Sequence, residues 1–78
     1  MKMEVRFPEL SHQDPGLEGV LATWFVADGQ IVEKDQLIAE VQVEKISAEV
    51  AAPASGKITL LAKEQDVVRQ NSVIARID

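Results

Sequence analysis

The chain has 78 residues, with 8 basic and 13 acidic side chains and a formal net charge of −5. This length predicts one domain, residues 1–78, with a thin core and little room for a deep substrate cleft. The acidic balance disfavours nucleic acid as a partner, and no run of about 18 apolar residues could span a membrane. The absence of Cys favours a reducing compartment. We expect the bacterial cytoplasm, or the mitochondrial matrix if a leader has been removed.

Val, Ile and Leu fall into short runs that turn residues separate about every ten positions, which is typical of an all-β domain. Asp28-Gly29 is a turn former because glycine tolerates a positive φ. Pro8 ends the first run because it cannot donate a hydrogen bond to a neighbouring strand. We expect six strands and two shorter pieces, at residues 3–7, 19–26, 31–32, 37–44, 46–51, 56–62, 67–68 and 73–77.

The two halves of the chain repeat one another. Three blocks align: Glu4 to Pro8 with Glu49 to Pro53 (offset 45), Gly19 to Leu21 with Gly56 to Ile58 (offset 37), and Val32, Ile38 and Ala39 with Val68, Ile74 and Ala75 (offset 36). The first half thus carries about eight extra residues between Pro8 and Gly19, and one more near Asp28-Gly29. Two similar halves predict two similar four-stranded sheets, related by a pseudo-two-fold axis and packed as a flattened β-barrel or sandwich, a barrel-sandwich hybrid.

The interior is expected to be aliphatic, because the only aromatic residues are Phe7, Trp24 and Phe25. The candidate interior residues are Leu21, Trp24, Val26, Leu37, Val41, Ile58, Leu61, Val68 and Ile74. Charge is divided unevenly, since residues 1–40 carry three basic and eight acidic groups (3 − 8 = −5) and residues 41–78 carry five of each. The acidic character therefore belongs to the first half.

The sequence contains no recognisable catalytic or metal-binding constellation. The single histidine, His12, follows Ser11 in a polar loop, and nothing supplies the third group that orients a Ser-His pair. A zinc site would need more His or Cys, and the four glycines are too dispersed for a phosphate loop. We expect His12 to be a solvated loop residue, with no metal and no catalytic residue in the chain.

The segment that joins the halves, residues 37–50, has two strand-forming arms around Glu44-Lys45. Its second arm alternates apolar and polar residues from Ile46 to Val50, as a half-buried strand does. A hairpin here would place Lys45 at the tip with its amine in water. Glu-Lys is not the Asn-Gly pair that two-residue turns prefer, so the local pattern alone is a weak indication of a site.

Taken in order, these features resemble the lipoyl domains of the biotinyl/lipoyl carrier family. The family's attachment motif, an acidic residue and the modified lysine between two strands, is matched by Val43-Glu44-Lys45-Ile46-Ser47. Further stretches that resemble the family span nearly the whole chain: Glu18-Gly19 with Trp24-Phe25-Val26, Asp28-Gly29-Gln30-Ile31-Val32, and Ala52-Pro53-Ala54-Ser55-Gly56-Lys57-Ile58.

Three residues depart from the family pattern. Val43 stands where a small polar residue is usual, and Glu44 where Asp is commonest. Gln65 stands in the second-half turn where Gly is frequent, which costs roughly 1 kcal/mol if this residue needs a positive φ. The acidic residue before the lysine is nevertheless kept.

The resemblance implies a carrier and not an enzyme. Lys45 would bear covalently attached lipoic acid, between the flanking residues Val43, Glu44, Ile46 and Ser47, as a swinging arm in a 2-oxo acid dehydrogenase complex. The implied partners are a thiamine-diphosphate 2-oxo acid dehydrogenase, an acyltransferase core, a flavin-dependent dihydrolipoamide dehydrogenase and a lipoate ligase or lipoyl transferase. The chain would be the lipoyl domain of a dihydrolipoamide acyltransferase component, monomeric in isolation.

Other interpretations stay open. Biotin acceptors usually have Met on both sides of the lysine, so Glu44 and Ile46 favour lipoate; Met1-Lys2-Met3 has those flanks but no preceding strand. An unmodified adaptor module, the longer glycine-cleavage carrier and a small enzyme are further alternatives. Residues 10–17, from Leu10 to Leu17, form a loop that we expect near the hairpin, where it would help to select the dehydrogenase partner.

Overall fold

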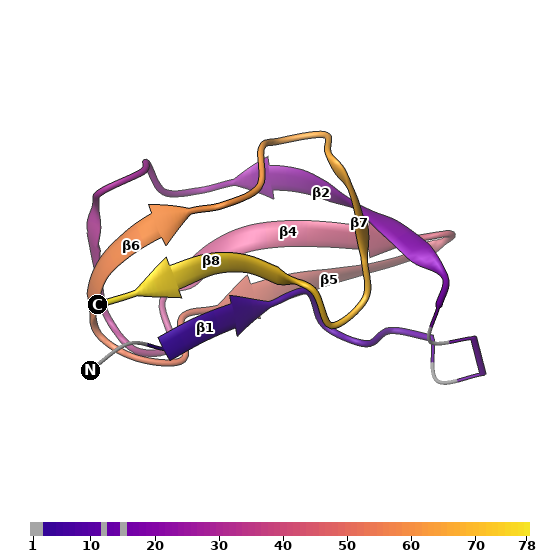
Figure 1. Ribbon diagram of the computed structural model, residues 1–78, viewed down its shortest axis with the longest axis horizontal. Helices are drawn as coiled ribbons and strands as arrows, with labels where there is room; N and C mark the ends of the chain where they lie inside the picture. The colour runs from indigo at the N-terminus through magenta and orange to yellow at the C-terminus, as the bar shows by residue number, and fades with distance from the viewer. Residues whose placement is uncertain (1–2, 12, 15) are drawn as a thin grey trace.

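The computed structural model describes residues 3–11, 13–14 and 16–78, and these form an all-β fold (Figure 1). The strands are β1 (Met3–Arg6), β2 (Glu18–Trp24), β3 (Ile31–Val32), β4 (Leu37–Val43), β5 (Ile46–Ala51), β6 (Gly56–Leu60), β7 (Val67–Arg69) and β8 (Val73–Ile77). All eight expected strands are confirmed. Lys2 and His12 lie outside the described residues. The described part of the chain has no helix long and apolar enough to cross a membrane.

Two four-stranded antiparallel sheets make up the molecule, with strand orders β1-β8-β6-β3 and β5-β4-β2-β7. Their inner faces share one apolar core, so the expected barrel-sandwich architecture is confirmed. The molecule measures 33 × 21 × 18 Å along its principal axes. The start of β1 and the end of β8 lie at one end of the long axis, and the turn between β4 and β5 lies at the other (Figure 1).

The core is almost entirely aliphatic, and among the described residues the one buried aromatic ring is that of Phe7. Its largest fully buried side chains are Phe7, Leu21, Ile38, Ile58, Ile74, Ile77, Val32, Val41 and Val43. Among the expected interior residues, five are buried: Leu21, Val26, Val41, Ile58 and Ile74. Val68 and Trp24 are partly buried and pack against this core. Removing these side chains from water supplies the main force that holds the two sheets together.

Two expected interior residues are instead on the surface, since Leu37 is 38% exposed and Leu61 is 54% exposed. Leu37 starts β4 beside a register shift, and the next residue, Ile38, takes the buried place. Leu61 follows the end of β6, where its N–H donates to Ile74 O (2.9 Å) after the strand alternation has stopped. Trp24 lies at the edge of the core, and its Nε1–H donates to Ala62 O (2.9 Å).

The predicted pseudo-two-fold symmetry is visible in the strand pairing. Strand β1 corresponds to β5, β8 to β4, β6 to β2 and β3 to β7, so the two strand orders are the same. The β1–β8 and β4–β5 pairs each contain a bulge, and the bulged residues, Ile74 and Ile38, are 36 positions apart. Both isoleucines are fully buried. Each bulge therefore directs an equivalent isoleucine into the core.

The turns repeat as closely as the strands. Gly29 (φ 86°) and Gln65 (φ 71°) are 36 positions apart, and both use the left-handed region of backbone space. The N–H of Gly29 donates to Ile58 O (2.8 Å), and that of Gln65 donates to Leu21 O (2.7 Å). Gln65 therefore does adopt the positive φ on which the cost of roughly 1 kcal/mol depends.

The one extra residue of the first half is not near Asp28-Gly29, so that expectation is wrong. It is Ala22, because the pairing of β2 with β4 shifts between Leu21 and Thr23. The equivalent pairing of β6 with β8 is regular through Ile58, Thr59 and Leu60. A bulge opposes two residues to one and so absorbs an additional residue within a strand. The offset between the halves therefore changes inside β2, before the turn at Gly29.

Candidate functional site

The turn between β4 and β5 consists of Glu44 and Lys45, since Val43 and Ile46 form the last cross-strand pair. Glu44 has a φ of 52°, and this left-handed conformation reverses the chain in two residues. The side-chain Nε2 of Gln42 donates to Glu44 O (2.8 Å) and ties the turn to the strand. The hairpin expected from the sequence is thus present, although it uses Glu where Gly or Asn is preferred.

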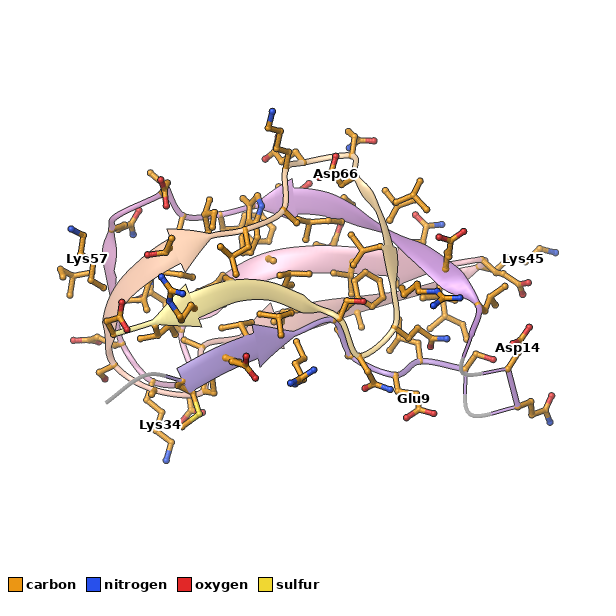
Figure 2. All side chains as sticks on the ribbon, viewed as in Figure 1. Glu9, Asp14, Lys34, Lys45, Lys57 and Asp66 are labelled. Atoms are coloured by element: carbon orange, nitrogen blue, oxygen red, sulfur yellow. The ribbon has the colours of Figure 1, made fainter. Side chains whose placement is uncertain are left out.

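The Lys45 side chain is exposed and extends away from the sheets at one end of the long axis (Figure 2). Among the described residues, no carboxylate lies within ion-pairing distance of its amine. The amine is therefore accessible to an enzyme that would acylate it. A side chain attached here would reach outward from the molecule and not across its surface.

Of the four residues that flank Lys45, one is buried in the core and three are exposed. Val43 is only 1% exposed and fixes the end of β4 in the core. Glu44 and Ser47 are exposed, and Ile46 is 49% exposed. Along β5, Val50 is buried and Ala48 packs partly buried against the core, so the expected alternation reaches the core at both residues. An enzyme that grips the turn would meet Glu44, Ile46 and Ser47 directly and Val43 only through the backbone.

Close packing at the start of β2 supports the hairpin from the side. A Cβ atom at Gly19 would lie 2.6 Å from Gln42 O and 2.7 Å from the Cγ2 atom of Val43. Only glycine leaves room for this approach, since real Cβ atoms do not come so near to a backbone oxygen. The end of β4 is therefore held against β2 immediately before Lys45.

The described residues of the loop, 10–11, 13–14 and 16–17, lie at the same end of the molecule as Lys45, as expected (Figure 2). Figure 2 shows Asp14 and Lys45 at one end of the long axis, with Lys34 and Lys57 at the other. The loop leads directly into Glu18 and Gly19 and so reaches the strand that packs on the hairpin. Continuing the β2–β4 register from Val20 opposite Gln42 places Glu18 across from Glu44. The sequence did not single out Gln70, whose side-chain amide bonds to the backbone of this loop.

The remaining described surface offers no second cluster of chemical groups. No three His, Asp or Glu side chains of residues 3–11, 13–14 and 16–78 are arranged to hold a metal ion. A hollow does lie between Trp24, Asp28 and the segment Leu60–Glu64. It is distant from the turn, because Trp24 pairs with Ala39, six residues before Lys45 along a strand that advances about 3.3 Å per residue. Lys45 does not contribute to that hollow.

Two pseudo-symmetric sheets that present a lysine on a two-residue hairpin define a barrel-sandwich hybrid domain. A family model described as "Biotin-requiring enzyme", which covers biotinyl and lipoyl domains, matches residues 3–77. The chain belongs to this biotinyl/lipoyl family. The resemblance drawn from the attachment motif and its neighbouring stretches is thereby confirmed.

Two of the relatives that match nearly the whole chain are acyltransferase components. The chain is 39% identical over 75 residues to the dihydrolipoyllysine-residue acetyltransferase component of the pyruvate dehydrogenase complex of Corynebacterium glutamicum, covering 95% of this chain and 11% of that protein. It is 30% identical over 77 residues to the succinyltransferase component of the 2-oxoglutarate dehydrogenase complex of Cupriavidus necator, covering 97% of this chain and 18% of that protein. The chain thus spans a small fraction of the length of the relatives it matches.

Solved structures agree with the fold. The solution structure of the lipoyl domain of the 2-oxoglutarate dehydrogenase complex from Azotobacter vinelandii superposes with a TM-score of 0.72 at 28% identity, covering all of this chain and 95% of that one. A urea carboxylase from Kluyveromyces lactis gives a TM-score of 0.76 at 22% identity over all of this chain and 6% of the carboxylase. At that identity the second likeness concerns the fold alone.

Proposed function

We propose that this chain is the lipoyl domain of a dihydrolipoyl acyltransferase component, with lipoic acid attached through an amide to the Nζ of Lys45. The observation that carries this proposal is the position of Lys45, exposed at the tip of the β4–β5 hairpin in a chain of the biotinyl/lipoyl family. The relatives described above, which match nearly the whole chain, are named dihydrolipoyllysine-residue acyltransferase components, and this supports lipoate as the attached group.

The domain contributes to the reaction by presenting the attached lipoyl group to other enzymes. When attached, the lipoyl dithiolane supplies the redox and acyl-carrying chemistry, and the protein supplies position and recognition. The buried Val43 and the Gln42 bond to Glu44 O hold the turn rigid, so that the Lys45 side chain starts from a fixed point. The start of β1 and the end of β8 lie at the opposite end (Figure 1), so a chain continuing from either would leave Lys45 accessible.

The proposed partners are the enzymes that would act on the arm in turn. A thiamine-diphosphate 2-oxo acid dehydrogenase would load the arm, an acyltransferase core would pass the acyl group to coenzyme A, and a flavin dehydrogenase would reoxidise the arm. Tethering within one complex raises the local concentration of the domain to the millimolar range, so weak binding to each enzyme suffices. Amide formation would remove the Lys45 cation and change the formal net charge from −5 to −6.

A biotinyl carrier domain is the second candidate function. The family description covers biotin-requiring enzymes, and the fold is shared with a urea carboxylase. The flanks of Lys45 separate the two, because Glu44 and Ile46 stand where biotin acceptors usually have methionines. An unmodified adaptor role would leave the exposed Lys45 without a use.

Intact-mass spectrometry tests the proposal. The chain is incubated with ATP, lipoate and a lipoate ligase, and in parallel with ATP, biotin and a biotin ligase. We expect the mass of one lipoyl group to be added, Lys45→Arg to prevent the addition, and the matched Lys34→Arg and Lys57→Arg variants at the opposite end to be modified normally (Figure 2). Efficient biotinylation, or lipoylation that persists in Lys45→Arg, would overturn the assignment.

A further inference from the structure

Gln70 is the one polar residue in the buried class among residues 3–11, 13–14 and 16–78, with 5% of its surface exposed. It lies between β7 and β8, where a short turn joins the two strands. A buried amide is costly unless its hydrogen bonds are satisfied. The partners of this side chain therefore show what keeps it inside.

The Gln70 amide makes four hydrogen bonds, all to the backbone of the loop that precedes β2. Its Oε1 accepts from the N–H of Leu10 (2.7 Å) and from that of Ser11 (2.8 Å). Its Nε2 donates to Asp14 O (3.1 Å) and to Leu17 O (3.0 Å). Both donors and both acceptor positions of the amide are in use. One side chain thus ties together the two ends and the middle of the loop.

The repeat shows that this arrangement is specific to the loop. The residue 36 positions before Gln70 is Lys34, which is exposed. The counterpart of the long loop is the short connection that joins β5 to β6, and the backbone N–H of Lys34 donates to the side-chain oxygen of Ser55 in this connection (2.9 Å). The turn that packs on the long loop therefore has the buried amide of Gln70, and the turn that packs on the short connection has the exposed Lys34. The exchange of Lys for Gln accompanies the insertion.

The loop that Gln70 holds ends beside the attachment turn. Leu17, whose carbonyl Gln70 binds, is followed by Glu18 and by Gly19, which packs against Gln42 O and the side chain of Val43. An enzyme that modifies the lysine itself needs to grip only the hairpin. An enzyme that acts on the far end of an extended arm must bring its own surface against a wider area around the turn, and this area includes the loop.

We propose that Gln70 is a positioning residue for reductive acylation: by fixing the loop beside Lys45, it pre-forms the surface that a thiamine-dependent 2-oxo acid dehydrogenase meets when it loads the arm. This inference rests on the proposed lipoyl function. Without the amide, the loop loses four bonds, and its ordering must be supplied when the enzyme docks. The loss weakens docking and leaves the chemical step unchanged.

The experiment compares Gln70→Leu with the matched variant Gln36→Leu. Gln36 also accepts a backbone bond, from the N–H of Glu33 (2.9 Å), but it lies in the turn of Lys34 at the opposite end from Lys45. Both variants are lipoylated, and loading is measured with pyruvate and 2-oxoglutarate dehydrogenase components as probes. For the enzyme that loads the wild-type chain, we expect KM to rise about tenfold in Gln70→Leu. We expect kcat and the lipoylation rate to stay within about twofold, and Gln36→Leu to match wild type in all three.

Amide hydrogen exchange supplies a readout that does not depend on the enzymes. Protection at Leu10 and Ser11 should be lost in Gln70→Leu, while core amides of β4 and β8 stay protected. Ser11→Pro, which removes one of the four bonds from the loop side, keeps the inference testable if Gln70→Leu fails to fold; we expect a KM increase of about threefold.

Two outcomes distinguish a failure of the role proposed for Gln70 from a failure of the proposed lipoyl function. A lipoylated Gln70→Leu chain that is loaded with the wild-type KM, or that loses kcat and lipoylation together, would overturn the role of Gln70 and leave the lipoyl assignment intact. A wild-type chain that no lipoate ligase modifies would overturn the proposed function itself.

Discussion

The two halves of the molecule share their backbone design and differ in a few side chains. Both halves place a bulged isoleucine in the core and a left-handed residue in each of two equivalent turns. In the described part of the chain, no second hairpin stands at the position equivalent to the one that carries Lys45. Its equivalent is the region where β8 ends and β1 begins, at the opposite end of the long axis (Figure 1). The repeat thus supplies a stable frame, from which the hairpin, the long loop and a few side chains depart.

Three of these departures concern residues 36 or 45 positions apart. Phe7 corresponds to Ala52, Gln70 to Lys34, and Arg76 to Glu40. Exchanging each residue for its counterpart asks how far the two halves differ in energy.

The largest effect is expected from Phe7→Ala, which gives the first half the residue of the second. Phe7 is fully buried, and its ring lies where a Cβ on Gly19 would touch it. Removing the ring should cost about 3–5 kcal/mol in unfolding free energy, a large share of the stability of a domain this size. Urea denaturation measures the loss. A cost below about 1 kcal/mol would show that neighbouring side chains fill the space left by the ring and pack around the new alanine as they do around Ala52.

The next comparison uses the glycines that begin β2 and β6. Gly19→Ala forces a methyl group against Gln42 O and should cost about 1–3 kcal/mol. Gly56→Ala meets the carbonyl of Asp78 in the same manner and also has a φ of 154°, so its cost should be larger. Thermal and urea unfolding of both variants check the order. Equal losses of unfolding free energy would mean that the positive φ at Gly56 adds no strain in the alanine variant.

Most of the fold was predictable because its information is local. Short apolar runs and turn residues specify strands one at a time, and the repeat in the sequence specifies their pairing into two similar sheets. The bulges were not predictable, because Ile38-Ala39 reads equally well with either residue inside. For the same reason Leu37 was placed in the core, and the additional residue of the first half was placed at the turn instead of at Ala22.

The site was predictable only in part. Lys45 could be singled out through the family resemblance, whereas the turn itself uses a positive φ at Glu44 that no local preference indicates. Gln70 could not be recognised, since its four bonds join residues 53 to 60 positions apart. Hydrogen bonds between a side chain and a distant loop leave no periodic pattern in the sequence.

A smaller effect is expected in the turns that contain Gly29 and Gln65. Both residues are left-handed, a conformation that costs a non-glycine residue roughly 1 kcal/mol. Gln65 offsets part of this cost, because its Nε2 donates to Ala22 O (2.8 Å). We expect Gln65→Gly to be more stable than Gln65→Ala by about 1 kcal/mol, since both lose the side-chain bond and only alanine keeps the strain. Equal urea midpoints for the two variants would argue against a strained turn.

The smallest expected effect concerns charge on the two outer sheet faces. In the sheet that carries the hairpin, Glu40 lies directly opposite Glu49, whereas the equivalent pair in the other sheet is Arg76 opposite Glu4. Like charges across a strand pair repel, so Glu40→Arg should stabilise the domain by about 0.5 kcal/mol. The gain should shrink in about 1 M salt, where screening is strong.

The matched reversal, Arg76→Glu, should destabilise the other sheet by a similar amount, measured by urea unfolding at low and high salt. If Glu40→Arg gives no gain at low salt, repulsion between Glu40 and Glu49 does not distinguish the sheets. If the gain appears as expected, the hairpin sheet retains a pair of carboxylates that its own stability does not favour. Under the proposed acylation, Lys45 would lose its charge and that sheet would present a still more acidic surface beside the attached group.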